Sequence, residues 1–209
     1  MAGEKSNART PSLLDSFLYY AEILYVEATG TRTMNQRKIK NERVAMMNNK
    51  LFVYGSLMAP EVVQTLLRRM PSKIQDPAFI HGFTRHPVRG CAFPGLVRSL
   101  TPSSRVEGLL FEDLTVKDME ILDWFEDEAY DKIVVDVHVQ GDNGVVGSVV
   151  QALVYLWSHP LEELDVDSSW CYRTFREQKL SSYIDDTVQP CRDELDDLHT
   201  RGNEEEKLD

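Results

Sequence analysis

A pattern of alternating apolar and polar residues in the second half of the chain constrains the fold more than any other feature. In KIVVDVHVQ, valines alternate with Asp136, His138 and Gln140. The turn-forming residues GDNG follow at 141–144, and a second apolar run, VVGSVVQALVYLW, comes after them. Such alternation around a glycine-containing turn is typical of a β-hairpin. The sequence therefore predicts an antiparallel pair of strands here.

Shorter segments predict the elements around this hairpin. Strands are expected at LFVY (51–54), in AFIHGF, around CAFPGLV and at VEGLLFEDL (106–114). Helices are expected at 60–69, at 115–126 with Thr115 as N-cap, and from Ser168, as a serine cap, to about Ile184, before Pro190. Strands outnumber helices and are joined by hairpins. We therefore expect an α+β domain with a small mixed, mainly antiparallel, barrel-like sheet and flanking helices.

Composition divides the 209 residues into three segments. Residues 1–48 are expected to be an N-terminal extension, partly helical or disordered, because an apolar stretch is followed by polar, basic sequence without a period. Residues 49–186 form the predicted domain, and 187–209 an acidic C-terminal tail. The stretch from Asp193 to Asp209 holds eight acids and two bases, so it supplies −6 of the net charge of −11.

Charge, hydropathy and cysteine content argue against a nucleic-acid-binding, membrane-spanning or metal-binding protein. The rest of the chain is mildly acidic, so we expect no nucleic-acid partner, since phosphate binding needs a basic face. The apolar stretch at 13–26 contains Asp15 and Glu22 and is shorter than the roughly 20 residues of a membrane span. Three cysteines at no motif spacing fit reduced thiols, so a cytoplasmic location without a metal site is expected.

The first candidate site is the segment YGSLM, from Tyr54 to Met58. A strand that ends at Gly55 and continues through Ser56 and Leu57 towards a helix presents consecutive backbone N–H groups, which can bind an anion. An ordinary strand-to-helix turn explains the same residues.

The second candidate is Glu126, in LDWFED. On a helix over 115–126 its side chain falls near the middle of the apolar stripe. Burial raises the pKa of a carboxyl, as a general base near neutral pH requires. Two alternatives remain: the helix frays before Glu126, or the carboxylate pairs with Arg85, Arg89 or Arg98.

These segments together resemble the γ-glutamylcyclotransferase-like family, and in particular its plant avirulence-induced branch. The matching segments are FVYGSL, FPG at 93–95, VEGLLF, LDWFED, Tyr130 and the closing helix that begins SSWCYRTF. YGSL followed about 70 residues later by LDxxE and an aromatic residue is the specific part. The resemblance covers about two thirds of the chain and implies a small barrel-like mixed sheet with flanking helices.

The resemblance also implies the roles of individual residues. Tyr54, Gly55, Ser56 and Leu57 would hold the substrate through backbone N–H groups, Glu126 would be the acid/base, and Tyr130 would line the pocket; Tyr130 as a core aromatic is the alternative. The sequence departs from many active relatives at Asp127, where they have glycine. A carboxylate there would raise the pKa of Glu126 further or alter the pocket.

The implied reaction is cyclisation of a γ-glutamyl amide to 5-oxoproline and a free amine or amino acid, without a metal or cofactor. The small-molecule γ-glutamyl substrate is the only partner expected, and the identity of its leaving amine and the oligomeric state stay open. Two alternatives are a non-catalytic module that binds or senses γ-glutamyl compounds, and acyl transfer to an external amine.

Overall fold

The computed structural model describes residues 49–141 and 146–205 of the chain. The chain divides into two compact units, Met1–Arg43 and Val44–Asp209, and only the second contains described residues. The predicted extension at 1–48 and most of the predicted turn at 141–144 lie outside the described residues.

Five strands form a closed barrel in the order β1-β5-β2-β6-β7. Every neighbouring pair is antiparallel except β1 and β7, which are parallel. The predicted α+β class with a mainly antiparallel, barrel-like sheet is confirmed. The barrel strands are β1 (Leu51–Val53), β2 (Lys73–His81), β5 (Arg105–Glu112), β6 (Tyr130–Gln140) and β7 (Val146–Trp157), and a separate two-stranded sheet consists of β3 (Phe83–Pro87) and β4 (Pro94–Arg98).

The predicted hairpin is the longest strand pair of the barrel. Strands β6 and β7 pair from Tyr130 opposite Trp157 to Gln140 opposite Val146. Val135 and Val137 are buried while Asp136 between them is exposed, as the alternation predicts.

Two buried clusters explain why β1 is apolar without alternation. Phe52 belongs to a cluster with residues of β2, β5, β6 and β7, whereas Leu51 and Val53 pack with residues of the helices. A strand buried on both faces is apolar at every position. The close pairing of β5 with β1 requires glycine at position 108, because a Cβ atom there would lie 2.2 Å from the carbonyl oxygen of Val53.

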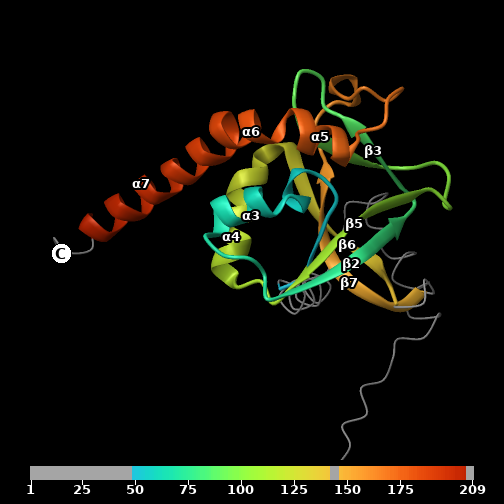
Figure 1. Ribbon diagram of the computed structural model, residues 1–209, viewed down its shortest axis with the longest axis horizontal. Helices are drawn as coiled ribbons and strands as arrows, with labels where there is room; N and C mark the ends of the chain where they lie inside the picture. The colour runs from blue at the N-terminus through green and yellow to red at the C-terminus, as the bar shows by residue number, and fades with distance from the viewer. Residues whose placement is uncertain (1–48, 142–145, 206–209) are drawn as a thin grey trace, which may run out of the picture. The chain divides into compact units, whose positions relative to one another are not determined.

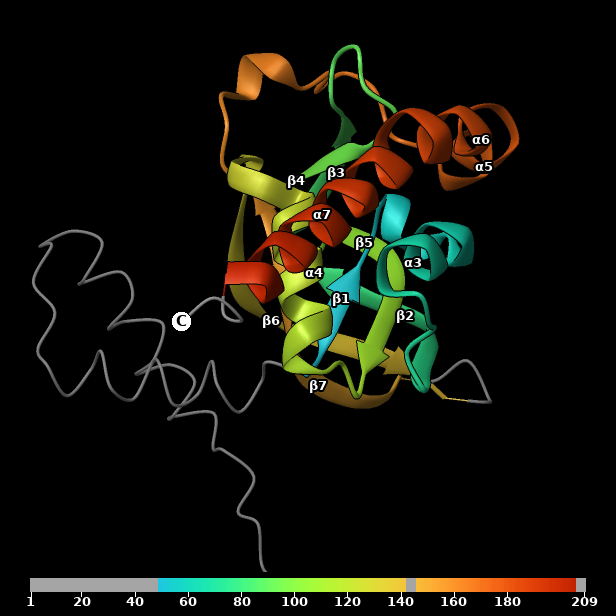
Figure 2. The same ribbon diagram turned by 90° about the vertical axis from the view of Figure 1, so that its left-hand side faces the viewer.

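Helices cover one side of the barrel. Figures 1 and 2 show α3, α4 and α7 on the same side, and α3 contacts both α4 and α7. The α-helices are α3 (Pro60–Leu67), α4 (Val116–Glu126), α5 (Tyr172–Gln178), α6 (Leu180–Tyr183) and α7 (Gln189–Glu205). Short 3₁₀ helices are η1 (Ser56–Met58), η2 (Asp127–Ala129) and η3 (Leu161–Glu163), and η4 (Ile184–Val188) is a π-helix.

Three predicted helix boundaries are wrong. Helix α3 ends at Leu67 rather than at 69, because Arg68 has left-handed backbone angles. The last helical region begins at Tyr172, and its N-cap is Cys171, without a side-chain hydrogen bond, instead of a serine. It also continues past Pro190 to Glu205. The wider π turn before Pro190 gives room to a ring that would crowd the carbonyl of an α-helix four residues earlier.

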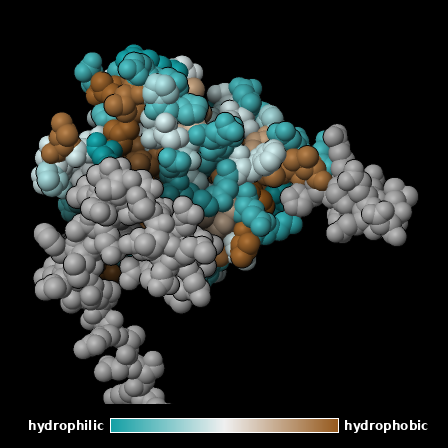
Figure 3. Space-filling view, turned by 180° about the vertical axis from the view of Figure 1, so that it is seen from behind, coloured by the Kyte–Doolittle hydropathy of each residue, from teal (hydrophilic) through white to brown (hydrophobic). Residues whose placement is uncertain are grey.

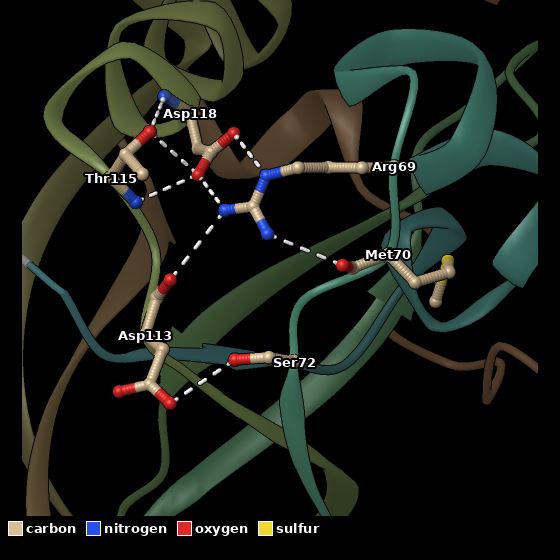
Figure 4. Close-up of polar contacts among 6 residues, drawn as sticks. All are labelled: Arg69, Met70, Ser72, Asp113, Thr115 and Asp118. Atoms are coloured by element: carbon tan, nitrogen blue, oxygen red, sulfur yellow. Dashed lines mark hydrogen bonds and ion pairs between the residues drawn. The ribbon is translucent and has the colours of Figure 1, made fainter.

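The N-terminus of α4 is held by the network in Figure 4. Asp118 N–H donates to Thr115 Oγ1 at 3.1 Å, and Thr115 N–H donates to the Asp118 carboxylate at 2.7 Å. This capping box confirms Thr115 as the N-cap. Arg69, which follows α3, donates two hydrogen bonds to the same carboxylate. The network therefore anchors α4 to the end of α3 and fixes the direction in which α4 runs.

The surface opposite the view of Figure 1 is mainly hydrophilic, with hydrophobic residues in several separate groups (Figure 3). No helix within 49–141 and 146–205 combines the length and the apolar character needed to cross a membrane.

Candidate active site

A cavity of about 240 Å³ lies where β1, η1 and the end of α4 meet. It brings together all six residues predicted to form a site, from segments far apart in the sequence. Its walls are formed by Phe52, Val53, Tyr54, Gly55, Ser56, Leu57, Phe93, Pro94, Phe125, Glu126, Asp127, Ala129, Tyr130, Tyr155, Tyr183 and Thr187.

The turn after β1 forms one wall of this cavity. Within η1, Met58 N–H donates to the Gly55 carbonyl at 3.0 Å, so the turn's hydrogen bonding begins at Met58. The N–H groups of Ser56 and Leu57 come before this first bond, and such leading amides have no partner inside the helix. Both residues line the cavity. Backbone donors are therefore available to an anionic or carbonyl oxygen of a ligand.

The other side of the turn is held by side chains from distant elements. Arg85 of β3 donates to the carbonyl of Tyr54, and its guanidinium lies 5.0 Å from the centre of the Trp170 ring. Tyr172 O–H donates to the carbonyl of Met58 at 2.9 Å. These bonds use the carbonyl groups of the turn and hold it in place.

Glu126 is the last residue of α4, and its carboxyl lies at the cavity wall. The side chain is half-buried, and no group in the described part of the chain donates a hydrogen bond to it or pairs with its charge. Burial, and after it the negative charge of Asp123, raises the pKa of Glu126 to about 8. A carboxyl with this pKa changes its charge near neutral pH, which suits proton transfer.

Both alternatives for Glu126 are wrong. Helix α4 extends through Glu126, so it does not fray earlier. The three arginines considered as partners bind elsewhere: Arg85 to the Tyr54 carbonyl, Arg89 to the Glu162 carbonyl, and Arg98 over the Phe83 ring.

Asp127 was expected either to raise the pKa of Glu126 further or to alter the pocket, and only the second effect agrees with the structure. The negative charge that raises the pKa of Glu126 is that of Asp123. Asp127 itself lines the cavity and has φ 54°, a backbone region that favours glycine. Asp127 adds a second carboxylate to the cavity wall.

Four tyrosines surround the carboxyl of Glu126. Burial is the main cause that raises the pKa of each, and the charge of Glu126 adds to it, so all four stay neutral hydroxyl donors near pH 7. Their hydroxyls donate as follows: Tyr54 to the Tyr155 carbonyl at 2.7 Å, Tyr130 to the Pro94 carbonyl at 2.9 Å, Tyr155 to Asp123 Oδ1 at 2.7 Å, and Tyr183 to Ser56 Oγ at 3.4 Å.

Sequence reasoning missed two of these tyrosines as cavity residues. Tyr183 falls in the predicted last helix and Tyr155 in the apolar run after the predicted turn, and neither has a predicted role in the site. A signal for Tyr155 exists, because it is a polar aromatic within the run ALVYLW of β7. No comparable signal marks Tyr183, whose place depends on how the C-terminal helices fold back.

The charged residues of the cavity wall are both acidic. Glu126 and Asp127 line it, whereas no lysine or arginine of the described segments does. Within those segments there is also no group of three or more histidine, cysteine or acidic side chains that could hold a metal ion.

The small closed barrel with helices on one side agrees with the fold that the resemblance implies. The chain belongs to the family described as "Gamma-glutamyl cyclotransferase, AIG2-like", whose model matches residues 51–173.

Several proteins of known sequence or structure are similar to this chain. AIG2-like protein C of Arabidopsis thaliana is 30% identical over 134 residues, which cover 64% of this chain and 73% of that protein. AIG2-like protein D of the same plant is 27% identical over 136 residues, covering 65% and 84%. A solution structure of another Arabidopsis thaliana protein is 24% identical, with a TM-score of 0.49, and covers 66% of this chain and 78% of its own. The resemblance found in the sequence is confirmed.

Proposed function

We propose that this protein cyclises a γ-glutamyl amide, releasing 5-oxoproline and a free amine or amino acid, with Glu126 as general acid and base. The observation that carries the proposal is the Glu126 carboxyl, which is half-buried and unpaired at a cavity shared with Ser56 and Leu57. Family membership supports it, although the AIG2-like names of the relatives state no reaction.

The substrate carries its own nucleophile. Ionised Glu126 takes a proton from the α-ammonium group, and the free amine nitrogen attacks the γ-carbonyl carbon, closing a five-membered ring. The amides of Ser56 and Leu57 stabilise the oxyanion that forms. The bond from the γ-carbon to the departing nitrogen then breaks, and Glu126 returns its proton to that nitrogen. The ring nitrogen carries one extra proton after the attack and passes it to the departing amine, so the products are the neutral lactam and an ammonium ion. Because attack is intramolecular, correct placement supplies much of the rate enhancement.

The pKa of about 8 for Glu126 gives this mechanism a pH dependence. The base is the ionised form, whose fraction rises with pH. We therefore expect kcat/KM to increase from pH 6 through the pKa of about 8 and to level off only above it, as far as Glu126 determines it.

The test is turnover by Glu126→Gln, which keeps the size of the side chain and removes its acid/base function. Full-length protein is incubated with γ-glutamylamines, γ-glutamyl amino acids and glutathione, and 5-oxoproline is measured by mass spectrometry. We expect a decrease of at least about 100-fold, the usual contribution of a general acid/base. Glu120→Gln, an exposed change on the same helix, is the matched control and should keep full activity.

Each outcome leads to a definite conclusion. Equal turnover by wild type and Glu126→Gln would remove Glu126 from the mechanism. Saturable binding of a γ-glutamyl compound without product would identify a binding or regulatory module instead of an enzyme. A γ-glutamyl adduct of an added amine, in place of 5-oxoproline, would show acyl transfer to an external acceptor.

A further inference from the structure

Asp123 lies one turn before Glu126 on α4, and both of its carboxylate oxygens are occupied. Tyr155 O–H donates to Oδ1 at 2.7 Å, and Lys132 Nζ donates to Oδ2 at 2.6 Å. Lys132 and Tyr155 are direct cross-strand partners on β6 and β7. Side chains at such positions lie close together, so the barrel presents two donors side by side to one carboxylate.

These contacts connect Asp123 to the cavity. Tyr155 lines the cavity, and its backbone carbonyl accepts the hydroxyl hydrogen of Tyr54 at 2.7 Å. Residues three apart on a helix lie on the same side, so Asp123 and Glu126 face the barrel together. The last turn of α4, which carries Glu126, is thereby fixed to β6 and β7.

Stability alone gives little reason for this arrangement. The side chains of Asp123 and Lys132 are 37% and 34% exposed, and an ion pair this accessible to solvent contributes little to stability. The two hydrogen bonds to Asp123 instead define where its negative charge lies relative to Glu126. That charge is the main cause, after burial, that raises the pKa of Glu126.

We propose that Asp123 is a positioning residue for Glu126: Tyr155 and Lys132 hold its carboxylate in one place, from which its negative charge acts on the Glu126 carboxyl. The significance for catalysis rests on the proposed function, whereas the electrostatic coupling itself does not require turnover.

Few other charges face Glu126. The four tyrosines remain neutral across the pH range in question because their pKa values are raised. Asp127 is the second carboxylate at the cavity wall. The titratable groups around Glu126 are Tyr54, directly after β1, Asp123 of α4, Asp127 of η2, Tyr130 of β6, Tyr155 of β7 and Tyr183 of α6.

The experiment is an NMR titration of the full chain with ¹³C-labelled glutamate carboxyls, in which the Glu126 signal is assigned by its loss in Glu126→Gln. We expect Asp123→Asn to lower the titration midpoint of Glu126 by on the order of one pH unit, the effect of removing a nearby like charge. Tyr155→Phe keeps the charge of Asp123 but removes one of its two hydrogen bonds, so it should lower the midpoint by less than Asp123→Asn does. Glu120→Gln, with the same charge change on the exposed side of α4, should leave the midpoint unchanged.

A midpoint that does not move in folded Asp123→Asn overturns the proposal. Should that variant not fold, Asp123→Ser removes the same charge and decides the question. If 5-oxoproline is produced, the acidic limb of kcat/KM should shift to lower pH in parallel with the midpoint. Wild type that makes no 5-oxoproline refutes the proposed function but leaves the titration result standing.

Discussion

The carboxyl of Glu126 binds its proton more tightly in the folded protein than in the unfolded chain. Its pKa is about 8 in the structure and about 4.3 in an unfolded chain. Between these values the unfolded state is ionised while the folded state keeps the proton. The stabilising contribution is therefore complete below about pH 4, decreases as the pH rises above that value, and is fully lost once the pH has passed about 8. A residue suited to proton transfer thus lowers stability at the pH where it acts.

Glu126→Gln should accordingly stabilise the fold, and more at high pH. We expect its free energy of unfolding to exceed that of wild type by on the order of a few kcal/mol at pH 9, because glutamine avoids an ionised buried group. The gain should be much smaller at pH 5. Urea unfolding at both values measures it, with Glu120→Gln as a control that shows no such difference. An equal gain at the two pH values would contradict an elevated pKa.

At the scale of elements, the start of α4 depends on one charged side chain. Asp118 is 5% exposed, and burial alone would raise its pKa, but hydrogen bonds from Arg69 and Thr115 lower the pKa below its usual value. A lowered pKa contributes stability above the unfolded value of about 3.9, and this stability is lost as the pH falls further.

We predict that substitutions in this capping network lower the free energy of unfolding by different amounts. Thr115→Ala should cost about 1 kcal/mol, the usual value of an N-cap. Asp118→Ala should cost more, roughly 2 kcal/mol or above, since it also leaves Arg69 without its carboxylate. Denaturant unfolding at pH 7 measures both. The Asp118→Ala deficit should shrink below pH 4, and a deficit that stays constant would show that charge has no part in it.

At the scale of the whole molecule, α7 is joined to the core. Val188 and Leu195 are 0% and 5% exposed and pack with the helices. Arg192 donates to the carbonyl of Leu66, at the end of α3, at 2.8 Å. The chain beyond residue 187 therefore contributes buried contacts as well as negative charge.

Removal of the C-terminal segment should destabilise the protein, whereas removal of the N-terminal segment should not change its stability. Ending the chain after Thr187 should lower the free energy of unfolding by roughly 3 kcal/mol or more, because two buried aliphatic side chains are lost. Starting it at Met46 should leave the unfolding transition unchanged, since β1, the first barrel strand among the described residues, begins at Leu51. Thermal unfolding of both variants beside the full chain tests this. A marked loss on starting at Met46 would contradict the proposed boundary at 48.

The sequence by itself determined the features that depend on near neighbours. Alternating valines predicted the β6–β7 pair, and Thr115 predicted the start of α4, because such patterns report which residues share a face and which backbone groups need a cap. The glycine-serine turn and the apolar position of Glu126 were readable for the same reason.

Only the tertiary structure decided what surrounds Glu126. The parallel pairing of Leu51 with Leu153 closes the barrel and places Tyr155 beside the turn at Ser56, a relation that no local period contains. The continuation of the helix past Pro190 is likewise unreadable locally, because contacts such as that of Arg192 with Leu66 favour it over the stop that proline predicts. The surroundings of Glu126 and the helix past Pro190 therefore depend on barrel closure and on packing between segments far apart in the sequence.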